Sequence, residues 1–303
     1  MQTSLSASCV GKLAARSLAS ARSGTVGEIL SVFPTSFYVK TADSDLVFVT
    51  NRQFRSPITL NLDSKMNLQQ IIKPQESVSV LENGIRIGES IQIDLRSAAQ
   101  YSELQGPRID QYALVKEALY RGSLILMIID NQLSVLDQAG LAHVEAAKFV
   151  SNGVLALRRS DDVDALRRAA HGLVGLGMGF TPSGDDLLGG FLATYNSFAH
   201  VVNHKTINLE FDALISRTSW ISAKLLDYMQ RQVLDDQVAT LIDSAAAHDS
   251  DTFVLALETL LPRGHTSGID ILVGVLLALG IIHDLSKDVE ITRNVANRLG
   301  LLQ

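Results

Sequence analysis

The alternation of apolar and polar residues changes character about one third of the way along the chain. Between residues 25 and 95, short apolar runs such as 37–39 and 46–49 alternate with polar positions and are separated by turn-forming residues. The pair Asn83-Gly84 is a strong signal for a two-residue turn and predicts a hairpin between residues 76–80 and 85–93. Short strands at this spacing are typical of a small barrel or sandwich.

From Ile109 onward, apolar residues recur three and four positions apart, which predicts helices. The clearest helical segments are residues 112–127, 163–174, 187–200, 214–233, 252–261 and 269–283. Near the N-terminus, Lys12 and Arg16 among small residues predict an amphipathic first helix. We therefore predict an α+β protein. An N-terminal helix and a β-rich barrel-like or sandwich-like part occupy residues 1–107, and a mainly α-helical domain occupies residues 108–303.

The chain is rich in apolar residues and poor in charged ones. The chain has 303 residues, of which 47% are apolar and 19% charged, and its mean hydropathy is +0.19. The most apolar stretch, residues 271–282, is shorter than the ~20 residues that a membrane-spanning helix needs. We therefore expect a buried helix there and no membrane association, with the remaining apolar surface in a large core or a subunit interface.

Charge and cysteine content exclude several classes of function. The net charge is −6 and no basic run is present, so nucleic acid is not an expected partner. The one cysteine, Cys9, excludes an intrachain disulfide and fits a reducing cytoplasm. The N-terminal segment lacks the continuous apolar run of roughly 7–15 residues that a secretory signal requires. Small molecules and protein partners remain for a cytoplasmic protein.

Residues 171–190 form the most unusual segment, since seven of these 20 residues are glycine, against a background of ~7%. Both Thr181-Pro182 and the spacing from Ser183 to Asp186 are signals for a helix start. A glycine-rich loop before a helix offers backbone N–H groups that bind anions. No lysine lies near the loop and no strand precedes it, so neither a P-loop nor a dinucleotide-binding site is predicted.

A second segment, residues 263–274, repeats the pattern Ser-Gly-x-Asp-x-Leu-x-Gly found in the first. The matched residues are Ser183, Gly184, Asp186, Leu188 and Gly190 in the first segment, and Ser267, Gly268, Asp270, Leu272 and Gly274 in the second. We predict that two related helix starts face each other across one cleft. A separation of Asp186 and Asp270 beyond about 20 Å, two helix diameters, would exclude this. The alternative is two ordinary capped helices whose glycines serve close packing.

Two further groups of polar residues have weaker signals. His265 lies inside the second segment near Arg263, where it has neighbours suited to acid–base chemistry or phosphate binding. A lone histidine is as often structural, so both interpretations stay open. The hydroxyl residues Thr218, Ser219 and Ser222 have helix-like spacing, for which a polar helix face is the simpler interpretation.

With these motifs in hand, the chain resembles a bacterial family that includes AllH, a subunit associated with oxamate carbamoyltransferase in anaerobic allantoin degradation. The segment 27–33 is similar to the N-terminal strand motif of the family. The segments 175–190 and 264–272 resemble its two Ser-Gly-x-Asp motifs, and residues 218–225 resemble the polar helix between them. The resemblance extends over roughly residues 20 to 285.

This resemblance implies a subunit of a multi-subunit enzyme of purine catabolism. The implied reaction moves a carbamoyl group between oxalurate and phosphate, giving oxamate and carbamoyl phosphate. The expected partners are therefore a small anionic substrate (carbamoyl phosphate, oxamate or phosphate) and other enzyme subunits.

The candidate site residues fall into two groups. The catalytic candidates are Asp185, Asp186, His265 and Asp270. The substrate-binding candidates are Gly177, Gly179, Thr181, Ser183, Gly184, Arg263, Gly264, Thr266, Ser267 and Gly268. Carboxylates repel anionic substrates, and a bound Mg²⁺ would relieve this repulsion, but the sequence leaves metal binding open.

Two other classes of function compete with a catalytic transferase subunit. One is a non-catalytic subunit that binds an anion or a sister subunit and positions an active site elsewhere. The other is a small-molecule kinase or hydrolase that uses the aspartates with a metal ion. Purine-catabolic neighbouring genes, or stabilisation by carbamoyl phosphate, would favour the transferase.

Overall fold

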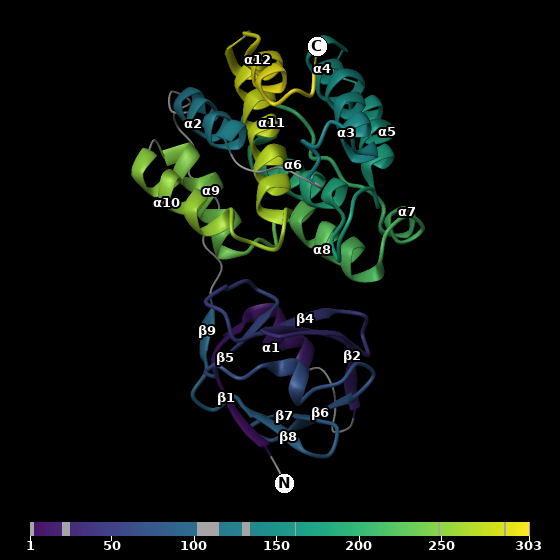
Figure 1. Cartoon of the computed structure of the whole chain (residues 1–303), viewed down its shortest axis with the longest axis vertical. Coiled ribbons are helices and arrows are strands. Elements are labelled where there is room, and N and C mark those ends of the chain that lie inside the picture. The colour runs from purple at the N-terminus through teal and green to yellow at the C-terminus, as the bar shows by residue number, and fades with distance from the viewer. Residues whose placement is uncertain are drawn as a thin grey trace. The chain divides into compact units, whose positions relative to one another are not determined.

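The computed structural model describes residues 3–19, 25–101, 115–128, 134–160, 162–247, 249–287 and 289–302. It divides into two compact units, Met1–Leu104 and Gln105–Gln303 (Figure 1). The boundary that the sequence predicts between residues 107 and 108 lies outside the described residues.

The first unit consists of strands and two short helices. Its strands are β1 (Thr3–Gly11), β2 (Thr25–Phe33), β3 (Ser36–Thr41), β4 (Leu46–Thr50), β5 (Thr59–Leu62), β6 (Ser77–Leu81), β7 (Gly84–Ile87), β8 (Ile91–Asp94) and β9 (Ala99–Tyr101). Helix α1 (Lys12–Ala19) and the 3₁₀ helix η1 (Leu68–Gln70) complete it. The predicted first helix is confirmed as α1. Strand β1, which precedes this helix, was not expected from the sequence.

This unit is a closed barrel. Its strands follow the order β5-β4-β3-β2-β6-β7-β8-β1-β9, and β1 also pairs with β5. Eight strands therefore form a ring, and β9 pairs with the end of β1. Alternate β1 side chains such as Leu5, Ala7 and Cys9 are buried, as the two-residue period of a strand requires. The choice between barrel and sandwich is thus settled by the β1–β5 pairing.

The second unit is helical, which confirms the predicted α+β class. Its helices are α2 (Val115–Ile128), α3 (Leu141–Lys148), the π-helix η2 (Phe149–Val154), α4 (Leu155–Ser160), α5 (Val163–Leu173), α6 (Ser183–Phe198), α7 (Phe211–Ile215), α8 (Trp220–Gln230), α9 (Asp236–Ala247), α10 (Ser250–Leu260), α11 (Ser267–Lys287) and α12 (Ile291–Arg298). Helices α6 and α11 lie side by side in its centre (Figure 1).

Helix α11 contains much of the apolar surplus. By length and composition it could cross a membrane, but 94% of its apolar window is buried inside the protein. Every residue from Gly268 to Asp284 is buried. The predicted buried helix is therefore confirmed, and it starts at Ser267 and extends past residue 282.

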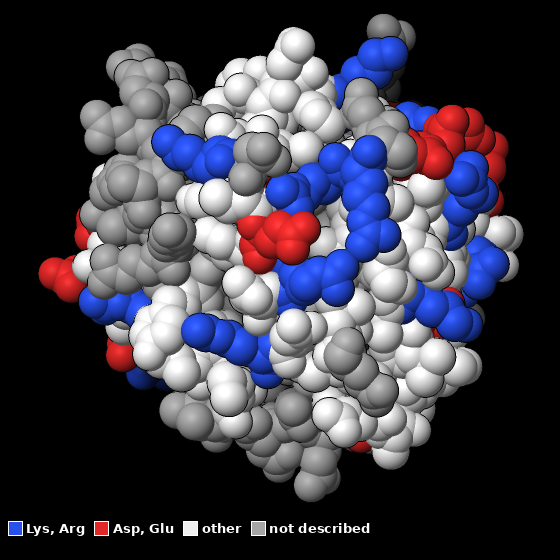
Figure 2. All heavy atoms as spheres, turned by 90° about the horizontal axis from the view of Figure 1, so that it is seen from above, with Lys and Arg blue, Asp and Glu red and all other residues white. Residues whose placement is uncertain are grey.

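Charged side chains are unevenly spread over the surface. On the face drawn in Figure 2, Lys and Arg side chains surround a smaller acidic group. The net charge of −6 therefore does not describe every part of the surface, because local clusters set the potential that a partner meets.

Candidate functional site

The two repeated segments meet in the helical unit. The loop 174–182 leads from α5 into α6, and the loop 261–266 leads from α10 into α11. The hydroxyl oxygens of Thr181 and Ser267 lie 3.2 Å apart and share a hydrogen bond. The juxtaposition that the repeat predicts is therefore present, and each helix start contributes side chains to the same place.

The repeated glycines explain how the two helices come so close. A Cβ atom on Gly190 would lie 2.1 Å from the carbonyl oxygen of Ile271 on α11. A Cβ atom on Gly274 would lie 2.0 Å from the carbonyl oxygen of Leu187 on α6. Real Cβ atoms do not approach backbone atoms so closely, so both positions require glycine. The contacts are reciprocal, and the crossing is nearly symmetric.

Gly184 and Gly268 also allow the backbone of a neighbouring segment to approach closely. A Cβ atom on Gly184 would lie 2.2 Å from the carbonyl oxygen of Leu173, and one on Gly268 would lie 2.1 Å from that of Leu260. Their backbone N–H groups donate within the protein, that of Gly184 to the Leu176 carbonyl and that of Gly268 to the Arg263 carbonyl. Anion binding by these two amides therefore stays a prediction that would require the loops to rearrange.

The helix starts differ from the capping patterns expected from sequence. Helix α6 begins at Ser183 after Pro182, and its N-cap makes no side-chain hydrogen bond. Ser183 is fully buried, and its hydroxyl contributes a hydrogen bond to Asp270 of the other segment. Ser267 correspondingly contributes a hydrogen bond to Asp186. The serine of each motif is thus hydrogen-bonded to the aspartate of the other motif.

Asp186 is the acid that lies closest to the contact between the loops. Its Oδ2 accepts a hydrogen bond of 3.0 Å from the Thr181 hydroxyl. Burial raises its pKa to about 7, and the nearby negative charge of Asp270 acts in the same direction. Hydrogen bonding by Ser267 and the positive charge of Arg263 oppose this shift. Asp186 therefore exchanges a proton near neutral pH, which suits general acid–base chemistry.

Asp270 is completely buried. Its Oδ1 accepts hydrogen bonds from the Ser134 hydroxyl (2.7 Å) and the Val135 backbone N–H (2.9 Å). Burial raises its pKa, and hydrogen bonds, including those from Ser134 and Val135, oppose the rise. Within the described part of the chain, Oδ2 makes no hydrogen bond of ordinary geometry. Asp270 is therefore placed to influence the charge of Asp186.

Asp185 has a different environment from its neighbour. It accepts hydrogen bonds from the Gly175 backbone N–H (2.8 Å) and from the hydroxyls of Thr218 (2.5 Å) and Ser222 (2.6 Å). It is 4% exposed. The carboxylate therefore ties the start of the glycine loop to the start of α8. This explains two hydroxyls of the cluster, those of Thr218 and Ser222, for which a polar helix face was the simpler interpretation. The third, Ser219, caps the start of α8.

The remaining candidates lie on the exposed side of the two loops. Gly177 and Gly179 are exposed and have φ angles of 110° and 106°, which favour glycine. Gly264, with a φ angle of 64°, and His265 are exposed, and Thr266 is partly buried. Arg263 forms an ion pair of 2.6 Å with the buried Asp235. The structure thus brings together Thr181, Ser183, Asp186, Ser267 and Asp270, whereas it leaves His265 and these three glycines exposed.

The donor set does not form a cation site. In the described part of the chain, we find no group of three or more His, Cys, Asp or Glu side chains that could hold a metal ion. Asp270 Oδ1 is already occupied by two donors from residues 134 and 135. The described side chains around Asp186 and Asp270 therefore do not fit Mg²⁺.

Three of the residues that contribute to the site from outside the repeated motifs have no signal in the sequence. Ser134 and Val135 hold Asp270 across a separation of more than 130 residues, and Asp235 holds Arg263. No local pattern marks these residues, because their roles depend on how distant segments pack. The hydroxyl spacing around Thr218 was a usable signal, although its partner Asp185 could not be deduced from it.

We expect the Asp186→Asn variant to be more stable than the wild type at pH 8 and equally stable at pH 4. A carboxyl whose pKa is about 7 in the folded state, against 3.8 as the ordinary value, binds a proton that the unfolded chain releases. Folding stability therefore falls as pH rises from about 4 to about 7. Removing the charge should restore about 1–3 kcal/mol. Urea unfolding at both pH values measures this.

Asp251→Asn is the matched control, since Asp251 is an exposed acid in the first turn of α10. It should show no comparable gain between pH 4 and pH 8. An Asp186→Asn protein that is no more stable than the wild type at pH 8 would contradict the buried, proton-holding state of this carboxyl.

The fold and the paired helix starts define a class. It consists of α+β proteins that join a closed barrel unit to a helical unit, in which two central helices begin with the same Ser-Gly-x-Asp motif. A family model described as oxamate carbamoyltransferase subunit AllH matches residues 173–279, which include both motifs. A second one, described as the AllH family N-terminal domain, matches residues 3–100.

Together these two matches cover most of the chain, and the chain belongs to the AllH family. No curated protein and no solved structure matches it. The family is named as a subunit of oxamate carbamoyltransferase, so the expectation drawn from the motifs is confirmed at the level of the family.

Proposed function

We propose that this chain is a cytoplasmic subunit of an oxamate carbamoyltransferase and that its paired loops, 177–181 and 263–267, form part of the site where the carbamoyl group is transferred. The observation that carries the proposal is the direct contact between the two family motifs, through Thr181 and Ser267. The two family matches supply the reaction class. Cys9 is buried and unbridged, which suits a reducing compartment.

The chemistry that such a site must support is a nucleophilic substitution at a carbonyl carbon. An oxygen of phosphate attacks the ureido carbonyl of oxalurate and forms a C–O bond. The C–N bond to the oxamate nitrogen then breaks, and that nitrogen takes up a proton. The products are carbamoyl phosphate and oxamate. The reaction needs recognition of two anions, stabilisation of charge at the carbonyl oxygen and a proton donor.

Several groups at and around the contact between the loops meet these needs. Asp186 has a pKa of about 7, so its protonated form can donate the proton that the leaving nitrogen requires. Arg263 and the exposed His265 are cationic or hydrogen-bonding groups suited to phosphate or carboxylate. The Thr181 and Ser267 hydroxyls are donors that already face the same point. Asp185 and Asp270 act as positioning residues in this proposal.

We expect the double variant Thr181→Val/Ser267→Ala, assembled with its partner subunits, to lose turnover by about 10- to 100-fold. The change removes both hydroxyls at the contact between the loops while the helices remain packed by their glycines. Formation of carbamoyl phosphate from oxalurate and phosphate is the readout. Ser216→Ala, at an exposed serine after α7, is the control and should keep full turnover.

The same measurement tests a second candidate function, in which the subunit binds partners and supplies no catalytic group. This candidate is favoured by the exposed apolar side chains Met178 and Phe180 in the glycine loop, which are 68% and 36% exposed. Exposed apolar residues of this kind are common at protein interfaces. An intact complex with unchanged turnover in the double variant would refute the catalytic role of the loops and favour this candidate.

A further inference from the structure

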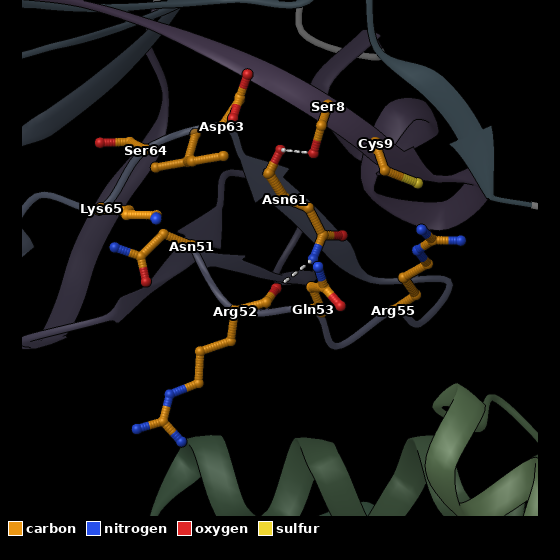
Figure 3. A pocket seen from close by; sticks show the side chains of 11 residues that line it. Ser8, Cys9, Asn51, Arg52, Gln53, Arg55, Asn61, Asp63, Ser64 and Lys65 are labelled. Atoms are coloured by element: carbon orange, nitrogen blue, oxygen red, sulfur yellow. Dashed lines mark hydrogen bonds between the residues drawn. The ribbon is translucent and has the colours of Figure 1, made fainter. Parts of the chain in front are cut away.

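The barrel unit contains a cavity, lined mostly by residues with polar or charged side chains, that the proposed function does not use. Its volume is about 580 Å³, and its lining comes from β1, from β5 and from the segments that follow β4 and β5. Figure 3 shows the side chains around it. Cavities of this volume are typical of sites for small molecules.

The charge around this cavity is opposite to that of the whole chain. Arg52, Arg55 and Lys65 are among its lining residues, against a single acid, Asp63. The chain as a whole carries −6. In Figure 3, Lys65 and Arg55 lie on opposite sides of Asn61, while the side chain of Arg52 extends away from Asn61. A concave surface with surplus positive charge concentrates anions from solution.

A buried asparagine holds the basic segment in place. Asn61 on β5 is 5% exposed, and its Nδ2 donates to the backbone carbonyls of Arg52 (3.0 Å) and Phe54 (2.6 Å). The segment that carries Arg52 and Arg55 is therefore fixed to a regular strand. Asn61 Oδ1 makes no hydrogen bond with any described residue. Cations on a pinned segment lose less conformational freedom when they bind a ligand, which favours affinity.

The lining also indicates the kind of anion. Guanidinium and ammonium groups bind phosphate and carboxylate oxygens. The amides of Asn51 and Gln53 and the hydroxyl of Ser64 offer hydrogen bonds to a neutral polar part of the same molecule. The lining residues include no aromatic ring, so a nucleoside base would have no stacking surface.

We infer that this cavity binds a small phosphate- or carboxylate-bearing metabolite with further polar groups, and not a nucleotide. The site belongs to the barrel unit alone and does not depend on the loops of the helical unit. It would give the subunit a second anion site, separate from the paired loops 177–181 and 263–267.

Isothermal titration of the full chain at low ionic strength tests this inference, with inorganic phosphate, oxamate and ATP as separate probes. Phosphate and oxamate distinguish the two anion types, and ATP tests whether a base contributes. We expect the double variant Arg55→Ala/Lys65→Ala to weaken binding of phosphate or oxamate by at least tenfold. Arg52→Ala should have a smaller effect, because its side chain extends away from Asn61.

The matched control is Lys73→Ala/Arg96→Ala, which removes one lysine and one arginine from exposed positions of the same unit outside the cavity lining. It should bind the probe as the wild type does. The Thr181→Val/Ser267→Ala variant should also keep this binding, which separates the two proposals. The inference is overturned if the wild type binds neither phosphate nor oxamate, or if ATP alone binds. It is also overturned if Arg55→Ala/Lys65→Ala and the control Lys73→Ala/Arg96→Ala weaken binding equally.

Discussion

Replacing Gly190 or Gly274 with alanine is expected to lower the free energy of unfolding of the helical unit by about 3 kcal/mol or more. In each case the added methyl group would lie about 2 Å from a backbone carbonyl oxygen of the facing helix. Backbone atoms in a packed helix cannot move aside as a side-chain end does, so α6 and α11 must separate. Trp220 on α8 is the single tryptophan of the chain, and its fluorescence during urea unfolding reports on this unit.

Gly189 provides the matched control for these two variants. It precedes Gly190 on the same helix, but a Cβ atom there would meet the side-chain sulfur of Met229 at 2.6 Å. A methionine side chain can rotate away, and alanine is favoured over glycine in a helix by about 1 kcal/mol. Gly189→Ala should therefore change stability by less than about 1 kcal/mol. Equal effects of Gly189→Ala and Gly190→Ala would contradict the proposed close crossing.

The Asp185→Ala variant is expected to lose about 3–5 kcal/mol of unfolding free energy. The substitution removes the acceptor for one backbone N–H and two hydroxyl groups, and it leaves the buried Ser222 and the partly buried Gly175 and Thr218 without this partner. Urea unfolding followed by Trp220 fluorescence is again the measurement. The helix that contains Trp220 begins next to the lost hydrogen bonds.

Asp185→Asn tests whether hydrogen bonding is the cause. Asparagine keeps the shape and one acceptor oxygen, so this variant should lose less stability than Asp185→Ala. Together with the stabilisation expected for Asp186→Asn at pH 8, the two adjacent acids should respond to substitution with opposite signs. A stable Asp185→Ala protein would show that this carboxylate does not hold the loop.

The sequence predicts the barrel unit well where strands are neighbours in sequence. The alternation between residues 25 and 95 corresponds to the observed hairpins, but Leu81 pairs with Gly84, so the turn consists of Glu82 and Asn83 and not of Asn83-Gly84. The predicted strand 85–93 is divided into β7 and β8 by a turn that contains Gly88, whose φ angle is 52°. Strand β1 was not expected, because its residues are small and polar and its partners β5, β8 and β9 lie far along the chain. Closure depends on these distant pairings, and no local pattern contains them.

In the helical unit the internal repeat predicts that the two helix starts meet, and the glycines of the repeat produce the contact. The repeat does not distinguish Asp185 from Asp186, although their environments differ greatly. Asp185 accepts a hydrogen bond from Thr218 at the start of α8, whereas Asp186 has a raised pKa and is hydrogen-bonded by Ser267. These differences depend on side chains from other elements. The cavity in the barrel unit has the same origin, since its cations come from segments on either side of β5.

The pairing of β1 determines when the barrel can form during synthesis. Strand β1 is synthesised before all of its partners, of which β8 ends only at Asp94. At roughly 5–20 residues per second, the first strand therefore has no complete set of neighbours for several seconds. During that interval both edges of β1 are unpaired and can pair with strands of other chains, so a chaperone that covers β1 would protect the nascent barrel unit.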